Sequence, residues 1–336
     1  MKLLITGSTG FLGRHLLLQA LNDRTFSTII LPVRNPEKLQ QQLRQDSIPP
    51  QDHRLLPCPV VENRWLLPPL AQETEVVIHA AGLLFARHRA DYFQSNVKST
   101  LHLLEALPEK SRFLALSSQS AAGPTREPKQ ILREQDLPAP ITWYGESKLA
   151  MEKELLARLP ERLLLLRPPM ILGPGDRAIL PLLKMANSSL RVKPGFFKKE
   201  YSWIAVDDLC RALLLAAKQE WRKLSGQLYF VANQKSITDL ELLETTAALL
   251  KSPGVTLRLP HFIIKFLSMI LDQIPALQDA YPSLGRDRVK EMLEQRWVVD
   301  GSAFEKDFSW IATKSLPQVL EEIILNTDSF KKRVSL

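Results

Sequence analysis

The sequence has few cysteines and no long apolar run. Cys58 and Cys210 are the only cysteines in 336 residues, and neither lies in a CxxC or histidine-rich neighbourhood. A disulfide framework and a zinc site are therefore not indicated, we expect no metal ligands, and a reducing cytoplasm fits. No segment reaches the ~18 consecutive apolar residues of a membrane span. Thr6-Gly7 ends the apolar start too early for a signal peptide.

Positive charge is present but not concentrated. The formal net charge is +8 and the isoelectric point is about 9.4, with 45% hydrophobic and 24% charged residues. This composition is typical of a folded protein with a large core. Because the basic residues form no dense cluster, we do not expect nucleic acid as a partner. The mild excess favours anionic small ligands such as phosphorylated cofactors, while peripheral membrane contact and a homodimer stay open.

A glycine-rich turn follows the first apolar strand. Residues 6–16 read TGSTGFLGRHL and come directly after Leu3–Thr6. Glycines at this spacing permit a sharp turn, a close approach of backbone amides to a pyrophosphate, and packing of the next helix on the sheet. The spacing is one residue longer than the usual fingerprint, so its place after the first strand is what indicates a nucleotide site. The residues expected to contact a cofactor are Gly7, Thr9, Gly10, Phe11, Leu12 and Gly13.

Strands and helices alternate along the chain to about residue 170, which predicts an α/β fold with a doubly wound parallel Rossmann sheet. We expect strands at Leu3–Thr6, Thr28–Val33, Arg54–Pro57, Val76–Ala80, Phe113–Ser117, Leu163–Arg167 and Leu228–Val231. We expect helices at Gly10–Ala20, Tyr92–Leu107, Tyr144–Ala157, Asp207–Lys218 and Thr238–Leu250. Later Pro and Gly clusters indicate a smaller, interleaved C-terminal substrate domain. The expected division is 1–172 with 203–235 for dinucleotide binding, and 173–202 with 236–330 for substrate.

The second strand ends in a cation. Arg34 stands where an acidic residue would hold the ribose 2′-hydroxyl of NAD, and Lys38 lies one helical turn further on. An arginine at this point pairs with the 2′-phosphate of NADP. We therefore expect NADP, with NAD less favoured, although a solvated loop charge would look the same in the sequence.

Tyr144 and Lys148 form a Tyr-x-x-x-Lys pair, which places both on one helix face. A nearby ammonium favours the phenolate, so the tyrosine can serve as an acid or base near neutral pH. Ser118 follows the strand Phe113–Ser117 at the sheet edge where ligands bind, and it can donate a hydrogen bond to a substrate oxygen. Capping of the following turn is the alternative role of Ser117 and Ser118.

These segments, with several others, resemble the extended short-chain dehydrogenase/reductase family, the NAD-dependent epimerase/dehydratases, and most nearly its 3β-hydroxysteroid dehydrogenase-like branch. The motifs that carry the resemblance are TGSTGFLG at 6–13, HAAG at 79–82, NVKST at 96–100, SSQSAAG at 117–123, YGESK at 144–148, LRPPMILGPGDR at 166–177 and WIAVDD at 203–208. The resemblance implies that Tyr144 is the general acid/base, that Lys148 lowers its pKa and binds the nicotinamide ribose, and that Ser118 orients the reacting oxygen. It also implies that Asn96 stabilises the junction near the site, that Ala80, Ala81 and Gly82 pass close to the cofactor, and that Pro168 and Met170 line the nicotinamide.

The expected function is that of an NADP-dependent oxidoreductase acting on a rather apolar small molecule, interconverting a secondary alcohol and a ketone or aldehyde. The apolar segment 260–271 could wall a greasy pocket, touch a membrane surface or form core. A nucleotide-sugar epimerase or dehydratase is the alternative, with Arg177, Arg191 and Arg286 available for a diphosphate. Residues 57–62 lack the Gly-Asp that commonly contacts adenine in this family. A non-catalytic, cofactor-sensing regulator is a remote third reading, because it predicts loss of Tyr144 or Lys148.

Overall fold

One large sheet organises the chain in the computed structural model, which describes residues 1–49, 52–61, 64–127, 130–221, 224, 226–271, 273–274 and 285–330. Its strand order is β12-β7-β6-β5-β1-β2-β3-β4, and all neighbours are parallel except β3 and β4. The strands are β1 (Lys2–Thr6), β2 (Thr28–Val33), β3 (Leu55–Val61), β4 (Arg64–Trp65), β5 (Val76–His79), β6 (Arg112–Leu116), β7 (Leu163–Arg167) and β12 (Leu228–Phe230). The predicted Rossmann-type α/β fold is confirmed.

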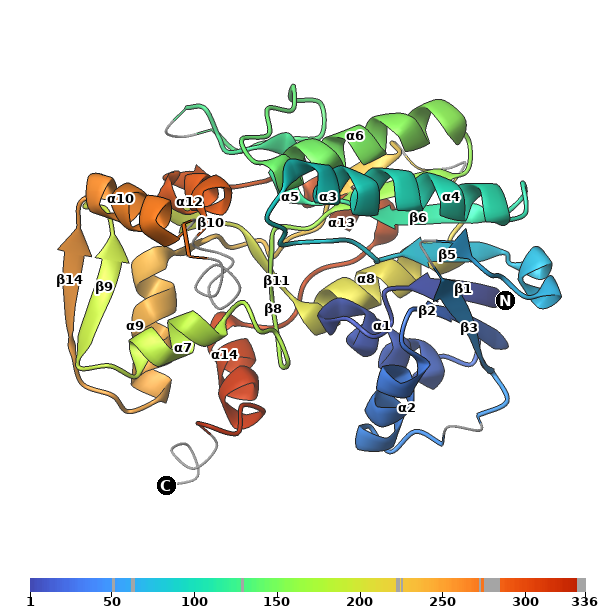
Figure 1. Cartoon of the computed structure of the whole chain (residues 1–336), viewed down its shortest axis with the longest axis horizontal. Coiled ribbons are helices and arrows are strands. Elements are labelled where there is room, and N and C mark those ends of the chain that lie inside the picture. The colour runs from blue at the N-terminus through green and yellow to red at the C-terminus, as the bar shows by residue number, and fades with distance from the viewer. Residues whose placement is uncertain are drawn as a thin grey trace.

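Helices cover both faces of this sheet (Figure 1). On one face lie α1 (Phe11–Asn22), α2 (Pro36–Gln45), α8 (Val206–Lys218) and α13 (Ser302–Phe308); on the other lie α4 (Ser99–Ala106) and α6 (Trp143–Arg158). Strand residues alternate between the two apolar cores, as Leu3 and Ile5 face α1 while Leu4 faces the α4 and α6 side. The sheet is therefore buried on both sides, which explains the nearly continuous apolar runs of its strands.

Two predicted elements differ from the structure. The helix expected at 92–107 starts earlier, as α3 (Arg89–Phe93), and continues through a π-helical turn (Gln94–Lys98) into α4. The strand expected at 54–57 runs on to Val61 through two prolines. A single π-helical turn is hard to recognise in a sequence, because it inserts one residue into the helix and shifts the apolar pattern by only one position.

The later part of the chain builds a second apolar core beside the sheet. Its helices are α7 (Leu180–Ala186), α9 (Asp239–Leu249), α10 (His261–Leu271), α12 (Arg286–Leu293) and α14 (Leu316–Leu325), and α5 (Gln119–Ala122) follows β6. Its small sheets are β8 (Met170–Leu172) with β11 (Trp203–Ala205), β9 (Leu190–Pro194) with β14 (Val255–Leu259), and β10 (Glu200–Tyr201) with β13 (Ile237–Thr238) and β15 (Arg296–Trp297). Leu183, Leu243 and Leu320 are buried together where α7, α9 and α14 meet.

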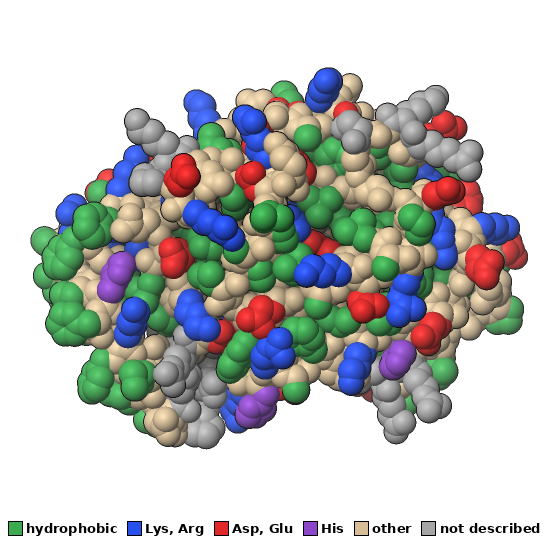
Figure 2. Space-filling view, turned by 90° about the horizontal axis from the view of Figure 1, so that it is seen from above, with side chains coloured by type: hydrophobic (Ala, Val, Ile, Leu, Met, Phe, Trp, Pro, Cys, Tyr) green, Lys and Arg blue, Asp and Glu red, His purple; other side chains and the backbone are tan. Residues whose placement is uncertain are grey.

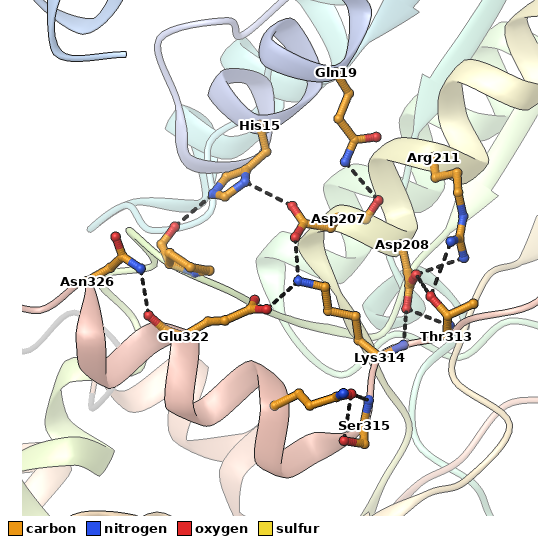
Figure 3. Close-up of polar contacts among 12 residues, drawn as sticks. His15, Gln19, Asp207, Asp208, Arg211, Thr313, Lys314, Ser315, Glu322 and Asn326 are labelled. Atoms are coloured by element: carbon orange, nitrogen blue, oxygen red, sulfur yellow. Dashed lines mark hydrogen bonds and ion pairs between the residues drawn. The ribbon is translucent and has the colours of Figure 1, made fainter. Parts of the chain in front are cut away.

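Asp208 joins α8 to the segment that precedes α14 (Figure 3). Its carboxylate is 2% exposed and accepts hydrogen bonds from the backbone N–H groups of Thr313 at 2.9 Å and Lys314 at 3.0 Å. The Thr313 hydroxyl and the Arg211 guanidinium donate to the same group. A buried carboxylate is stable only when it is paired and hydrogen-bonded, so this segment is tightly fixed to α8.

The neighbouring Asp207 extends this connection to α1 (Figure 3). His15 contacts an Asp207 oxygen through Nδ1 at 3.3 Å and the Pro174 carbonyl oxygen through Nε2 at 2.8 Å. Lys314 lies 2.9 Å from Asp207 and also bonds Glu322 of α14. The His15 hydrogen bond and the Lys314 ammonium hold the pKa of Asp207 well below its usual range. The helix that follows the glycine-rich turn is thus linked to the C-terminal core.

Candidate active site

The glycine-rich turn lies at the carboxyl end of β1, packed against the turn after β5. Gly7 has a positive φ of 74°, and a Cβ placed on it would stand 2.9 Å from the Ala81 amide nitrogen. A Cβ on Gly13 would stand 2.0 Å from the Gly7 carbonyl oxygen. Both positions therefore require glycine, Gly7 for its backbone angle and its neighbour, and Gly13 for the close packing of α1 on the turn.

The amino end of α1 presents unsatisfied donors at this turn. Its N-cap residue, Gly10, has no side chain to cap the helix, and the buried Ser8 hydroxyl has no hydrogen-bond partner. Gln42 of α2 fixes the loop by donating to the Thr9 carbonyl at 3.2 Å. The uncapped N–H groups of α1, its helix dipole and the unpaired Ser8 hydroxyl can together bind an anionic group such as a pyrophosphate.

A buried chain of hydrogen bonds connects β1 and β5 to the helix behind them. The Ala81 N–H donates to Thr6 Oγ1 at 3.0 Å, and Thr6 Oγ1 lies 2.9 Å from His79 Nδ1. On the other side of the ring, His79 Nε2 lies 2.8 Å from Thr100 Oγ1, which donates to the Asn96 carbonyl. This order of donors requires a proton on Nε2 and none on Nδ1. Burial lowers the His79 pKa to about 3, so the ring is neutral and has a structural role, linking the Thr6 and Thr100 hydroxyls.

Tyr144 and Ser118 come together at the carboxyl edge of the sheet. Tyr144 is in the first turn of α6 and is 9% exposed, and Ser118 is the N-cap of α5, where its hydroxyl accepts from the Ser120 N–H. Burial raises the pKa of Tyr144 to about 12, although the Arg288 guanidinium and the Ser118 hydroxyl near the phenol oppose the rise. The direction is opposite to the lowered pKa expected at this position, because the desolvation of a phenolate here outweighs the cations around it.

Lys148 lies one turn further along α6, above a buried ion pair. Its ammonium is 4% exposed and donates to the Leu116 carbonyl at 2.7 Å. Burial lowers its pKa from 10.5 to about 8, and the charge of Glu152 opposes that fall. Glu152 is itself bidentate to Arg167, with 2.8 Å for the Nε contact, and accepts from the Ser117 hydroxyl. Ser117 therefore serves this network rather than the reacting oxygen.

Asn96 ties the turn after β5 to α6. Its side chain is buried, accepts from the Leu83 N–H at 2.7 Å and donates to the Ser147 hydroxyl at 2.9 Å. Gly82 lies in the same turn, and a Cβ on it would be 3.3 Å from both Asn96 Oδ1 and Lys148 Nζ. The turn, the π-helical segment and α6 are thus fixed against one another.

Sequence reasoning missed Arg288, which lies beside Tyr144. Its guanidinium carbon is 5.1 Å from the centre of the Tyr144 ring and 5.4 Å from that of Phe85, and it pairs with Glu291 at 2.8 Å. Glu291 also accepts from the Thr142 hydroxyl at the start of α6. Helix α12 is polar and far from Tyr144 in the sequence. Its run of charged residues is typical of a solvated surface, so the sequence gives no indication that this helix contributes to the site.

The other predicted positions are distributed around this centre. Arg34 is exposed at the end of β2, next to the Asn35 side chain that caps α2. The Pro168 carbonyl accepts from the Gln119 N–H, and Met170 pairs with Trp203 in the β8 and β11 sheet. Phe11 and Leu12 begin α1, with Leu12 buried. Arg177 is exposed, Arg191 donates to the Ser252 carbonyl in the β9 region, and the Arg286 side chain lies outside the described residues.

Comparison with known proteins identifies the family. A sequence profile of the NAD dependent epimerase/dehydratase family matches residues 3–232. The chain belongs to this family. It is 27% identical over 250 residues to a sterol-4-alpha-carboxylate 3-dehydrogenase (decarboxylating) of Candida albicans, covering 69% of this chain and 70% of that one. It is 28% identical over 295 residues to a ceramide reductase of Caulobacter vibrioides, covering 88% and 84%.

Solved structures show the same fold in other members of the epimerase/dehydratase family. The dTDP-glucose 4,6-dehydratase of Bacillus anthracis, solved with NAD, superposes with a TM-score of 0.75 over 100% of this chain and 99% of that one, at 17% identity. The protein is thus an NAD(P)-dependent enzyme of the extended short-chain dehydrogenase/reductase type. Within the part of the chain that the structure describes, no helix is both long and apolar enough to cross a membrane.

Proposed function

We propose that this enzyme uses NADP to reduce a ketone on a rather apolar small molecule, and in reverse oxidises the secondary alcohol. The observation that carries the proposal is the buried Tyr144 phenol, with the Ser118 hydroxyl near it and the Arg288 cation beside its ring. With a pKa raised to about 12, Tyr144 keeps its proton near neutral pH. A protonated phenol is what a carbonyl needs as it gains a hydride, so the reductive direction is favoured.

The residues around the glycine-rich turn support cofactor binding. NADP, when bound, supplies or accepts the hydride. We assign its pyrophosphate to the amino end of α1 and its 2′-phosphate to Arg34, since the end of β2 carries no carboxylate. Gly82 lies against Asn96 and Lys148. We assign these three residues, with Ala80 and Ala81 of the same turn, to the nicotinamide ribose.

Each protein group has a distinct role in the proposed proton transfer. The substrate carbonyl oxygen would accept hydrogen bonds from Ser118 and Tyr144. As negative charge develops on that oxygen, Tyr144 gives up its proton, and the nearby Arg288 stabilises the resulting phenolate. Lys148, whose pKa is lowered to about 8, lies one helical turn from Tyr144 and can exchange its proton near neutral pH.

An apolar substrate is supported by the arrangement of the arginines. A nucleotide-sugar diphosphate calls for arginines that converge on one anion site. Among the described side chains Arg288 stands beside Tyr144, whereas Arg177 is exposed and Arg191 is engaged with Ser252. The sterol dehydrogenase and the ceramide reductase among the relatives are named for lipid-like substrates.

The chemical role is tested by Tyr144→Phe. We expect turnover of NADPH with a panel of hydrophobic ketones to fall by a factor on the order of 10² or more, with NADPH affinity nearly unchanged. Tyr201→Phe, which packs against the second apolar core, is the matched control and should keep normal turnover. Normal turnover in Tyr144→Phe would place the acid elsewhere. A protein that copurifies with NAD and releases no reduced product would favour the epimerase alternative instead.

The choice of cofactor is tested by Arg34→Ala. A charge-assisted contact to the 2′-phosphate is worth roughly 1.5–3 kcal/mol, so we expect the preference for NADPH over NADH to fall at least tenfold in fluorescence titrations. Arg44→Ala, an exposed arginine at the other end of α2, should leave the preference intact. Equal affinities of the unmodified protein for the two cofactors would end this argument.

A further inference from the structure

Helix α10 turns its apolar side away from the protein. Phe262, Phe266 and Met269 are 71%, 62% and 50% exposed, at the spacing of a single helix face, whereas Ser268 on the opposite side is buried. A helix in a water-soluble domain normally shows the reverse order, with its apolar stripe facing the core. The apolar side of this helix is therefore not part of a core.

The adjoining ribbon of β9 and β14 has the same inverted order. Along β9 the charged Arg191 and Lys193 point inward and are buried, while Leu190 is 58% exposed. Parallel pairing puts Val255 beside Leu190 and Leu257 beside Val192, so one face of the ribbon is apolar and faces outward. Lys193 is held inside by an ion pair with Asp239 at 2.7 Å. The inversion is thus built into the packing.

These surfaces are continuous. Gly195 follows β9 and lies against His261 at the start of α10, and Phe196 and Phe197 in the next turn are 57% and 66% exposed. We call the exposed side chains of residues 190–197 and 255–270 the apolar tip. It holds half of the exposed large hydrophobic side chains among the described residues. Figure 2 shows hydrophobic side chains gathered at this end of the molecule, the left-hand end in Figure 1.

The two segments that form the apolar tip carry charge of one sign. Segments 188–199 and 251–271 contain seven lysines and arginines and no aspartate or glutamate. Of these, Lys198, Lys251, Arg258 and Lys265 are exposed. A twofold contact between two copies would bring the two sets of cations together, which is unfavourable. An apolar face with a basic surround instead complements an anionic, hydrocarbon-filled surface.

We propose that the apolar tip docks on a lipid bilayer that contains anionic phospholipid. The phenylalanines and aliphatic side chains enter the interface between headgroups and acyl chains, and the exposed cations contact the lipid phosphates. Helix α10 packs against α12, which carries Arg288 beside Tyr144. A hydrophobic substrate leaving the bilayer at the tip would thus emerge near the candidate active site. The docking itself does not depend on the proposed reaction.

Vesicle flotation of the full chain tests the proposal, without cofactor or substrate. We expect binding to vesicles of phosphatidylcholine with phosphatidylglycerol, weaker binding to phosphatidylcholine alone, and a loss as salt is raised. Phe262→Ser/Phe266→Ser should weaken binding by on the order of tenfold or more, since two aromatic side chains no longer enter the interface. Val61→Ser/Leu66→Ser removes two similarly exposed apolar side chains at the opposite edge of the sheet and should bind as the unmodified protein does.

Other results would overturn the proposal. Absence of binding to either vesicle, or equal binding by both double variants, would mean that the apolar tip is not a membrane surface. Sedimentation measurements identify the competing occupant: an oligomer that dissociates in Phe262→Ser/Phe266→Ser, in a protein that does not float with vesicles, would make the tip an interface between copies of the chain. Unfolding midpoints of the two double variants exclude misfolding as the cause of lost binding.

Discussion

Replacement of Lys148 by methionine should stabilise the protein while abolishing its activity. The ammonium is 4% exposed, and burial lowers its pKa from 10.5 to about 8. This change corresponds to about 3 kcal/mol of destabilisation when the group is charged in both folded and unfolded chains. The variant leaves the Leu116 carbonyl without its donor, which costs about 1 kcal/mol. The expected net gain in the free energy of unfolding is about 2 kcal/mol near neutral pH.

The pH dependence of the gain has a definite sign. Below pH 8, Lys148 is protonated in both folded and unfolded chains, so the folded protein carries the full penalty. Between about 8 and 10.5 the unfolded chain binds more protons than the folded one, and the stability of the unmodified protein rises with pH. The advantage of Lys148→Met should therefore shrink across that window, and above it the variant should be about 1 kcal/mol less stable, because only the lost donor to Leu116 remains.

Urea unfolding at about pH 7 and about pH 9.5 measures this difference. Lys153→Met, an exposed lysine on the same helix, is the matched control and should show little change at either pH. A Lys148→Met variant that is less stable than the unmodified protein near neutral pH, or a gain that is the same at both values, would refute the reasoning.

Two other perturbations follow from the site. Gly13→Ala should lower stability by about 1–3 kcal/mol, since its Cβ would overlap the Gly7 carbonyl, and it should weaken cofactor binding. Gly226→Ala is the control, because a Cβ there would meet only the Leu228 carbonyl oxygen, at 3.9 Å. Equal melting temperatures for the two variants would contradict the packing argument. Arg288→Met should shift the pH profile of alcohol oxidation to higher pH, because the guanidinium lowers the pKa of Tyr144. Arg288→Lys keeps a cation at this position and should keep most of the profile. A pH profile that does not move in Arg288→Met would show that Arg288 takes no part in the proton transfer.

The parts of the site that follow the local chain were predictable from sequence. Glycine spacing after a strand and the Tyr-x-x-x-Lys pair are short-range patterns, and the strand and helix that carry them fold as expected. Asn96 and Gly82 also lie together next to Lys148. These positions are set by backbone sterics and helix periodicity, which a sequence records directly.

Contacts between distant segments were not predictable. Arg288 reaches Tyr144 because α12 docks on the start of α6 through Glu291 and Thr142, a pairing with no local signature. The pKa of Tyr144 likewise depends on how completely the fold excludes water from it. The outward apolar face of α10 was hidden as well, because periodicity shows that a helix has an apolar side and not which way it faces.

The bonds between Asp208 and the segment before α14 also bear on how the chain is made. Thr313 and Lys314 are more than a hundred residues later in the sequence than the carboxylate that they satisfy. During synthesis, the part of the chain that carries the glycine-rich turn and Asp208 leaves the ribosome long before these donors exist, with a carboxylate at a position that will be buried. The last part of the chain to be synthesised thus completes the support behind the first helix. We expect nascent chains that stop before Thr313 to bind cofactor poorly, even though every motif that recognises it has already been translated.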